Sequence, residues 1–253
     1  PLKSPLISII TITLNAEIYL EQTIQSVLNQ TCKNIEYIIV DGGSTDGTLG
    51  VIEKYKNEIA HIISEKDEGI ADAMNKGAAL AQGDYIIFLH ADDYFAHDNA
   101  IEAVVEKMDR TADIVACNIQ YGVRQSTCKP RGFNFWFNFK QGIYHQGIVC
   151  RRDLIEKLNG FDTQFRIAMD YDFFLRAYRR GAKLIKVPAV LSVMRDTGIS
   201  SRQDWQSLKV RFNEERRVHE KNCGASSMRI LYKLYWFLYL PYRKVSSFVK
   251  KLG

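Results

Sequence analysis

The first ninety residues alternate between short apolar runs rich in β-branched residues and segments whose apolar residues recur at helical spacing. The runs at residues 6–14, 36–40, 61–64 and 85–89 are too short to span a membrane and predict buried strands. The intervening segments, at 17–30, 49–55 and 70–81, predict helices. This alternation predicts an α/β fold with a Rossmann-like, mostly parallel sheet flanked by helices, and a ligand crevice at the carboxyl ends of the strands.

The rest of the chain has less regular patterns. We expect further strands at 114–119, 144–150 and 183–187, the last an edge strand stopped by Pro188, and helices at 96–108, 152–158 and 168–177. A chain of 253 residues suits one large domain with an appendage. We place the α/β domain at residues 1–200 and a helical appendage at 201–253.

The five cysteines are an odd number, scattered and without a Cys-x-x-Cys pair, which favours neither a disulfide framework nor a zinc site. Segment 6–14 has the pattern of a strand and not of a secretion signal. We therefore expect a protein of the reducing cytoplasm.

Three polar clusters follow predicted strands: Thr13 with Asn15, residues 41–44, and residues 90–93. Parallel strands bring their carboxyl ends to one edge, so these clusters should lie together. Asp41 could accept hydrogen bonds from a ribose or base, and Gly42 and Gly43 would allow close backbone approach to a ligand. An ordinary turn explains the same residues equally well.

Asp92 and Asp93 follow the apolar run 85–89 after two residues, and such a carboxylate pair can hold a hard divalent cation through oxygen. They could instead be turn formers or a helix N-cap. The chain has neither a Gly-x-Gly-x-x-Gly after its first strand nor a Gly-x4-Gly-Lys-Ser/Thr motif. Any bound phosphates must therefore be held by a metal and by side chains.

Five segments, taken in order and spacing, resemble the family 2 glycosyltransferases: 8–15, 40–48, 67–77, 89–93 and 169–172. The resemblance covers roughly residues 6–200. It implies a GT-A fold and a single, inverting transfer of a sugar from a nucleotide diphosphosugar, by family habit a UDP-sugar, to an acceptor hydroxyl. The Gln-x-x-Arg-Trp motif of processive members is absent from the sequence.

The resemblance also implies the residues that contact the donor. Asp41 would bind the base or ribose, and segment 67–77 would line the base and sugar. His90 stands where the family motif has its first acid, which leaves Asp92, with Asp93, as the expected ligands of Mg²⁺ or Mn²⁺ and His90 as a hydrogen-bond donor. The full expected donor set is Thr13, Asn15, Asp41, Gly43, Asp67, Asp72, Asn75, Lys76, His90, Ala91 and Asp92.

Asp170 matches the position of the family's catalytic base. Displacing a nucleotide diphosphate by an alcohol needs a base for the hydroxyl proton, and a carboxylate facing the acceptor supplies one. Stabilising the helix dipole is the structural alternative for Asp170 and Asp172. Further candidates for the pyrophosphate or acceptor are His145, Gln146, Asp172 and Arg195, although His145 could equally be a core histidine.

Residues 200–253 hold 12 Lys/Arg against 4 Asp/Glu, a net charge of +8, so the total of +5 leaves −3 for the rest. Within 228–253, aromatic residues alternate with cations and no acid is present. This favours a membrane-surface helix, and an acceptor such as a polyprenyl-diphosphate-linked saccharide used in surface polysaccharide assembly of the O-antigen or capsule type. We accordingly expect peripheral association with the inner face of the cell membrane. The alternative is a helix docked on protein; nothing upstream supports nucleic acid.

Two other functions remain open at this point. A sugar nucleotidyltransferase would share the sheet, but it usually has a Gly-rich basic loop after the first strand, where this chain has Asn15, Ala16 and Glu17. A catalytically silent protein that binds nucleotide sugars is the second alternative, because His90 replaces an acid of the metal motif.

Overall fold

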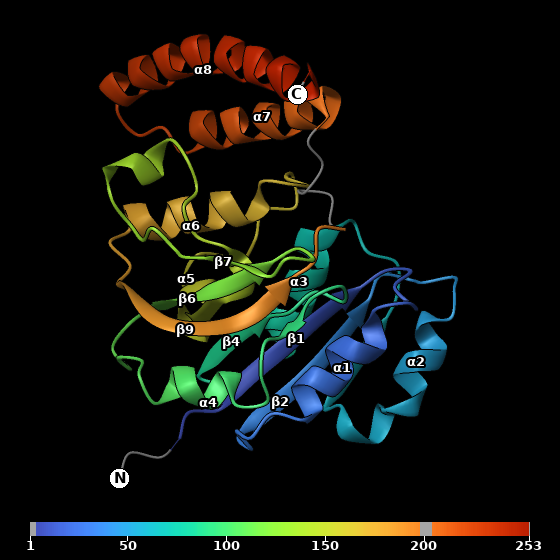
Figure 1. Cartoon of the computed structure of the whole chain (residues 1–253). Coiled ribbons are helices and arrows are strands. Elements are labelled where there is room, and N and C mark those ends of the chain that lie inside the picture. The colour runs from blue at the N-terminus through green and yellow to red at the C-terminus, as the bar shows by residue number, and fades with distance from the viewer. Residues whose placement is uncertain (1–3, 198–203, 253) are drawn as a thin grey trace.

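The computed structural model describes residues 4–197 and 204–252, and in these residues nine strands form one sheet (Figure 1). Four strands of the amino-terminal half lie side by side and parallel, in the order β3-β2-β1-β4. They are β1 (Ile7–Thr13), β2 (Ile35–Asp41), β3 (His61–Ser64) and β4 (Tyr85–Phe88). This half confirms the predicted α/β alternation.

The other half of the sheet is mixed, unlike the mostly parallel sheet that the sequence predicts. Its strands are β5 (Tyr94–Phe95), β6 (Ile114–Tyr121), β7 (Ser126–Cys128), β8 (Ile148–Arg151) and β9 (Leu184–Met194). Strand β8 lies antiparallel between β4 and β6. Antiparallel neighbours need no helical crossover, so the irregular segment between β7 and β8 can return the chain directly.

Strand β9 corrects the predicted edge strand at 183–187. It continues past Pro188 to Met194 and lies between β6 and β5. The register jumps here, because Cys117 pairs with Val187 whereas Asn118 pairs with Val190. Proline is tolerated at such a bulge because its missing N–H is not needed for a ladder bond.

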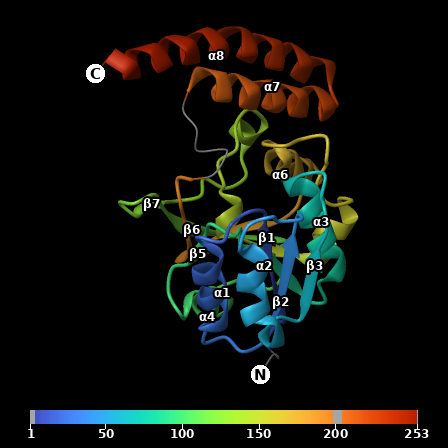
Figure 2. The same ribbon diagram turned by 90° about the vertical axis from the view of Figure 1, so that its right-hand side faces the viewer.

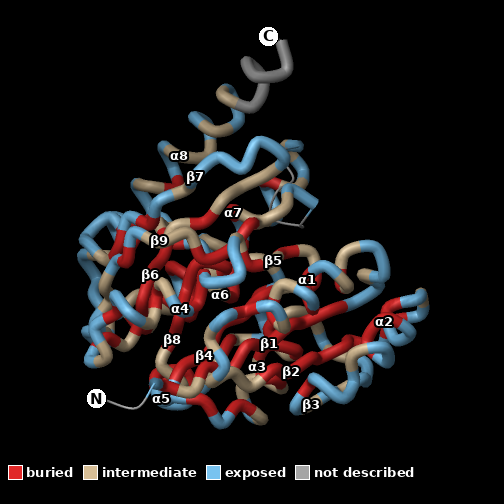
Figure 3. Tube along the Cα trace, turned by 60° about the horizontal axis from the view of Figure 1, so that its bottom comes forward, coloured by how far each residue is buried: buried red, intermediate tan, exposed pale blue. Residues whose placement is uncertain are grey.

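Helices cover both faces of the sheet, as Figures 1 and 3 show. One face carries α1 (Leu20–Leu28), α2 (Thr48–Lys54) and α4 (Ala100–Val105). The other face carries α3 (Ile70–Leu80), α5 (Arg152–Lys157) and α6 (Met169–Arg179). Helix α4 is shorter than the predicted helix at 96–108. Side chains of β1 alternate between the two cores, with Ile7 and Ile9 in one and Ile10 and Ile12 in the other. Short 3-10 helices lie at Lys56–Glu58, Phe135–Asn138 and His145–Gly147.

Helices α7 (Trp205–Lys221) and α8 (Ser226–Leu252) stack above α6 (Figures 1 and 2). Leu208, Phe212 and Trp236 form a small core between them. The Glu214 carboxylate accepts the backbone N–H groups of residues 166–168, and so caps the amino end of α6. Residues 201–203 of the predicted appendage lie outside the described residues.

A buried hydrogen-bonded chain also joins the appendage to the α/β domain. Trp236 Nε1 donates to His219 Nδ1 at 2.9 Å, and His219 Nε2 lies 2.8 Å from the Tyr171 hydroxyl. The inner face of α8 is therefore docked on protein. Among the helices of the described residues, none offers a stretch long and apolar enough to cross a membrane.

Candidate active site

A cavity of about 720 Å³ opens beyond the carboxyl ends of β1 and β4 and extends to α6, α7 and α8. A cavity large enough for a ligand therefore lies at the carboxyl ends of the strands, where the sequence predicts a ligand crevice. Eleven of the predicted site residues line it, and they come from six separate stretches of sequence: Thr13, Asn15, Asp67, His90, Ala91, Asp92, Asp93, His145, Gln146, Asp170 and Arg195.

Asp92 and Asp93 lie side by side in this cavity, after β4. Asp93 is 2% exposed, and its burial, with the neighbouring Asp92 charge, raises the pKa of its carboxyl to about 7. The Arg195 N–H donates to Asp93 at 3.1 Å, and the Thr197 hydroxyl donates to Asp92 at 2.9 Å. Two adjacent carboxylates at one edge of a cavity form a donor set that suits Mg²⁺ or Mn²⁺.

Among residues 4–197 and 204–252, no three His, Cys, Asp or Glu side chains cluster as a complete metal site. Proteins often bind Mg²⁺ through only one or two carboxylates, with substrate phosphates and water as the other ligands. Asp92 and Asp93 therefore fit an ion that arrives with a diphosphate.

Arg195, which directly follows β9, is fixed beside the acid pair. Its guanidinium carbon lies 4.8 Å from the ring centroids of both Tyr19 and Tyr94. The same guanidinium donates to the Asp92 carbonyl and to the Gln22 side chain. A cation held in this way is suited to meet the phosphates of a ligand.

Asp170 lies in the first turn of α6 and lines the cavity. Its Oδ2 accepts from Gln141 Nε2 at 2.9 Å and lies 3.4 Å from His145 Nδ1, while its Oδ1 accepts the Tyr171 N–H at 2.7 Å. The carboxylate is thus oriented from three sides, as a base facing an acceptor hydroxyl requires.

Two histidines lie between the acid pair and Asp170. The ring centroids of His90 and His145 are 4.5 Å apart, and both Nε2 atoms are buried with no partner among the described residues. Burial, helped by His145, lowers the pKa of His90 well below its usual range. The hydrogen-bonding role of His90 therefore stays a prediction, and His145 contacts Asp170.

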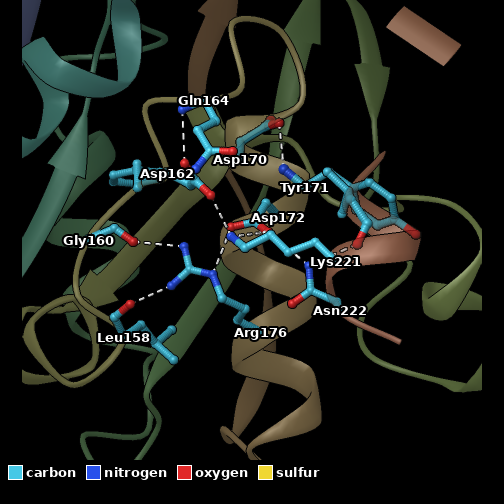
Figure 4. Close-up of polar contacts among 12 residues, drawn as sticks. Leu158, Gly160, Asp162, Gln164, Asp170, Tyr171, Asp172, Arg176, Lys221 and Asn222 are labelled. Atoms are coloured by element: carbon cyan, nitrogen blue, oxygen red, sulfur yellow. Dashed lines mark hydrogen bonds and ion pairs between the residues drawn. The ribbon is translucent and has the colours of Figure 1, made fainter. Parts of the chain in front are cut away.

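Asp172 lies outside the cavity, contrary to its predicted role at the pyrophosphate or acceptor. It is fully buried and pairs with Arg176 Nε at 2.7 Å, Lys221 Nζ at 3.0 Å and Asn222 Nδ2 at 2.8 Å (Figure 4). A helix turns about 100° per residue, so side chains two positions apart point to nearly opposite faces. Asp170 therefore faces the cavity and Asp172 faces α7.

Asp41 and Gly43 also lie outside the cavity lining. The Asp41 carboxylate is fully buried and accepts from the Gly43 and Ser44 N–H groups and from the Ser64 hydroxyl. Gly43 has a φ of +87°, which a glycine adopts without strain. These contacts match the turn alternative, and the Asp41 oxygens are already occupied.

The α3 candidates have structural partners as well. Asn75 exchanges two 2.8 Å hydrogen bonds with the Phe161 backbone, and Lys76 pairs with Glu65 at 2.7 Å and Asp72 at 3.3 Å. Asp67 alone of this segment's candidates lines the cavity. Asp72 and Lys76 are therefore placed to support the loop that carries Asp67, whereas Asn75 supports the loop at Phe161.

One wall of the cavity is lined by residues that are not among the predicted site residues. It consists of Arg211 and Glu215 on α7 and Tyr239 and Arg243 on α8, together with Lys140 and Arg166. The basic charge of residues 200–253 was the available signal, but charge alone does not tell which helix face points inward. Burial raises the pKa of Glu215 to about 7, with Arg211 and Lys140 opposing the rise.

Residues 8–183 match the model of glycosyl transferase family 2. A PGL/p-HBAD biosynthesis glycosyltransferase of Mycobacterium bovis is 34% identical over 187 residues, covering 71% of this chain and 72% of the relative. An uncharacterized glycosyltransferase of Mycobacterium tuberculosis is 31% identical over 232 residues, covering 85% and 83%.

Solved structures share the fold. The mannosyltransferase PcManGT from Pyrobaculum calidifontis, solved with GDP-Man and Mn2+, has a TM-score of 0.71 at 20% identity. The match covers 98% of this chain and 74% of the PcManGT chain. S. aureus TarS 1-349 with UDP-GlcNAc has a TM-score of 0.64 at 19% identity, and the match covers 84% of this chain and 65% of the TarS 1-349 chain. This chain spans 38% of the longer TarS chain. The predicted GT-A fold is confirmed, and the family match over most of the chain shows that it belongs to the family 2 glycosyltransferases, as an enzyme of the hexosyltransferase type.

Proposed function

We propose that this chain transfers one sugar per encounter from a nucleotide diphosphosugar to an acceptor hydroxyl, with inversion at the anomeric carbon. One observation carries the proposal: folding brings Asp170 on α6 and the Asp92/Asp93 pair after β4, distant in sequence, into one cavity. A base for the acceptor and ligands for the diphosphate are the two parts that a single displacement needs.

Asp170 would take the proton of the acceptor hydroxyl at its carboxylate while Gln141 and His145 hold that carboxylate in place. Asp92 and Asp93 would hold Mg²⁺ or Mn²⁺, which when bound neutralises charge on the departing diphosphate. Arg195 would bind the same phosphates from the rim. No covalent enzyme intermediate is needed, and one displacement inverts the anomeric centre.

For the donor we propose a UDP-sugar. Solved neighbours bound to UDP-GlcNAc and to GDP-Man with Mn2+ support a nucleoside-diphosphate sugar and a divalent ion without choosing between the two bases. The test is to incubate the protein with a panel of UDP- and GDP-sugars and Mn²⁺ and record which one is consumed. Consumption of GDP-sugars alone would refute the choice of UDP.

The assignment of the base has its own test. Asp170→Asn should abolish transfer and metal-dependent donor hydrolysis but keep nucleotide binding. Asp153→Asn, an exposed acid in the first turn of α5, is the matched control. Unchanged turnover in Asp170→Asn would remove Asp170 as the base. A wild-type protein that binds nucleotide sugars but consumes none would favour the silent alternative.

We also propose that the acceptor is a polyprenyl-diphosphate-linked saccharide of surface polysaccharide assembly and that α8 rests on the inner face of the cell membrane. Large apolar side chains lie exposed along α8 at helical spacing: Ile230, Leu231, Leu234, Phe237, Leu238, Tyr242 and Val245. Phe237 is 76% exposed, and Arg229, Lys233 and Lys244 lie exposed on the same helix. An apolar stripe with adjacent cations suits an anionic bilayer surface.

Vesicle flotation tests this part. The wild-type chain should float with phosphatidylcholine vesicles that contain phosphatidylglycerol, and Leu234→Glu with Phe237→Glu should abolish flotation. Val123→Glu changes another exposed apolar residue, in the turn between β6 and β7, and should float as the wild type does. Flotation that survives the double change would refute the surface, and a dimer that the same change dissociates would assign the stripe to a second copy.

A further inference from the structure

Two arginines from different helices lie on one aromatic ring at the cavity wall. The guanidinium carbons of Arg211 (α7) and Arg243 (α8) lie 5.4 and 5.2 Å from the Phe212 ring centroid. Arg243 also donates to the Tyr239 hydroxyl at 2.8 Å, and Arg211 pairs with Glu215 at 3.7 Å. These contacts restrict both side chains, so less conformational entropy would be lost when they bind a ligand.

The charge of this wall is positive. Lys140 and Arg166 line the same cavity, so this wall carries four cations and one carboxyl, that of Glu215, with the Asp170 carboxylate nearby. Burial raises the pKa of Glu215 to about 7, which leaves its charge partly neutralised near neutral pH. Such a wall is complementary to an anion in a partly dry site, where charge-assisted hydrogen bonds are strong.

The wall lies on the acceptor side of the proposed reaction. Lys140 is followed directly by Gln141, whose side chain holds the Asp170 carboxylate. The phosphates of the donor have a separate proposed site at Asp92, Asp93 and Arg195, which come from the loop after β4 and the end of β9. The cations of α7 and α8 thus lie on other elements than that donor site.

We propose that Arg211 and Arg243, with Lys140 and Arg166, form an acceptor subsite that binds a phosphate or diphosphate group carried by the acceptor. This inference deepens the proposed function and rests on it. The anionic group would anchor the non-reacting end of the acceptor while its sugar hydroxyl reaches Asp170. The group could belong to a lipid-linked saccharide or to a free phosphorylated one, since both present the same oxygens.

Direct binding to the full chain tests the subsite. Isothermal titration calorimetry with farnesyl diphosphate, inorganic diphosphate and farnesol is run in EDTA, so that no ion bridges diphosphate to the acid pair. Arg211→Gln with Arg243→Gln should weaken farnesyl diphosphate binding about tenfold to a hundredfold, the range for losing charge-assisted bonds. Glu215→Gln removes the opposing carboxyl and should tighten binding.

Arg216→Gln is the matched control, because Arg216 lies on the same helix with a 56% exposed side chain paired to Glu220. It should bind farnesyl diphosphate as the wild type does. Equal loss in Arg216→Gln, or wild-type affinity in the double variant, would overturn the subsite. Circular dichroism checks that each variant is folded, and the opposite effect of Glu215→Gln separates a charge effect from a folding defect.

The three ligands distinguish the source of the anion. Farnesyl diphosphate binding much more tightly than inorganic diphosphate supports a lipid-linked acceptor, and equal affinities support a free phosphorylated one. Farnesol binding as tightly as farnesyl diphosphate would overturn the proposal. The titration contains no nucleotide sugar, so a failure of sugar transfer would refute the proposed function without changing this result.

Discussion

His219 should make the stability of this protein depend on pH. The side chain is fully buried between Trp236 and Tyr171 and stacks on the Tyr232 ring at 4.3 Å. Because Nδ1 accepts the hydrogen bond from Trp236, the single proton of the neutral ring lies on Nε2, which faces the Tyr171 hydroxyl. The Tyr171 hydroxyl in turn lies within hydrogen-bonding distance of the backbone carbonyls of residues 137 and 138. A second proton on the ring would have to bind Nδ1, and this would break the hydrogen bond that Nδ1 accepts from Trp236.

Burial, with the nearby Arg179 charge, lowers the pKa of His219 from 6.5 to about 3. Below pH 6.5 His219 therefore binds a proton in the unfolded chain, whereas in the folded chain it stays neutral. The stabilisation is complete above pH 6.5 and is lost as the pH falls toward 3. Between pH 7 and pH 5 this pKa difference lowers the free energy of unfolding by about 2 kcal/mol.

Urea unfolding followed by circular dichroism at pH 7, 6 and 5 measures this effect. His219→Gln cannot titrate, so its stability relative to wild type should improve by about 2 kcal/mol from pH 7 to pH 5, although it is less stable than wild type at pH 7. His97→Gln, which removes an exposed imidazole, is the control. Parallel pH profiles for wild type and His219→Gln would refute the reasoning.

Three further changes test other contacts. Asp172→Asn leaves Arg176 and Lys221 without their buried partner, so it should lower the free energy of unfolding by about 3 kcal/mol in urea titrations. Glu214→Gln weakens the cap of α6, and we expect a loss of about 1 kcal/mol in the same assay. Gln141→Ala frees the Asp170 carboxylate and should lower kcat about tenfold with little change in the KM for the donor, measured by steady-state transfer.

The sequence alone determined the amino-terminal half of the fold and the place of the site. Apolar runs that alternate with helical spacing dictate parallel strands, and parallel strands put the residues that follow them at one edge. Thr13, Asn15 and residues 90–93 therefore met in the cavity as expected. The ordered motifs also indicated the family, which the comparison then showed.

Only the tertiary structure decided which acids remain available to a ligand. Asp41, Asp170 and Asp172 carry the same functional group, but the fold surrounds Asp41 with its own turn, pairs Asp172 with α7 and leaves Asp170 facing the cavity. It also folded α7 and α8 back, so that Arg211 and Arg243 complete the wall. Local spacing sets the direction of a side chain on its own helix, whereas its partners come from segments distant in sequence, which only packing brings near.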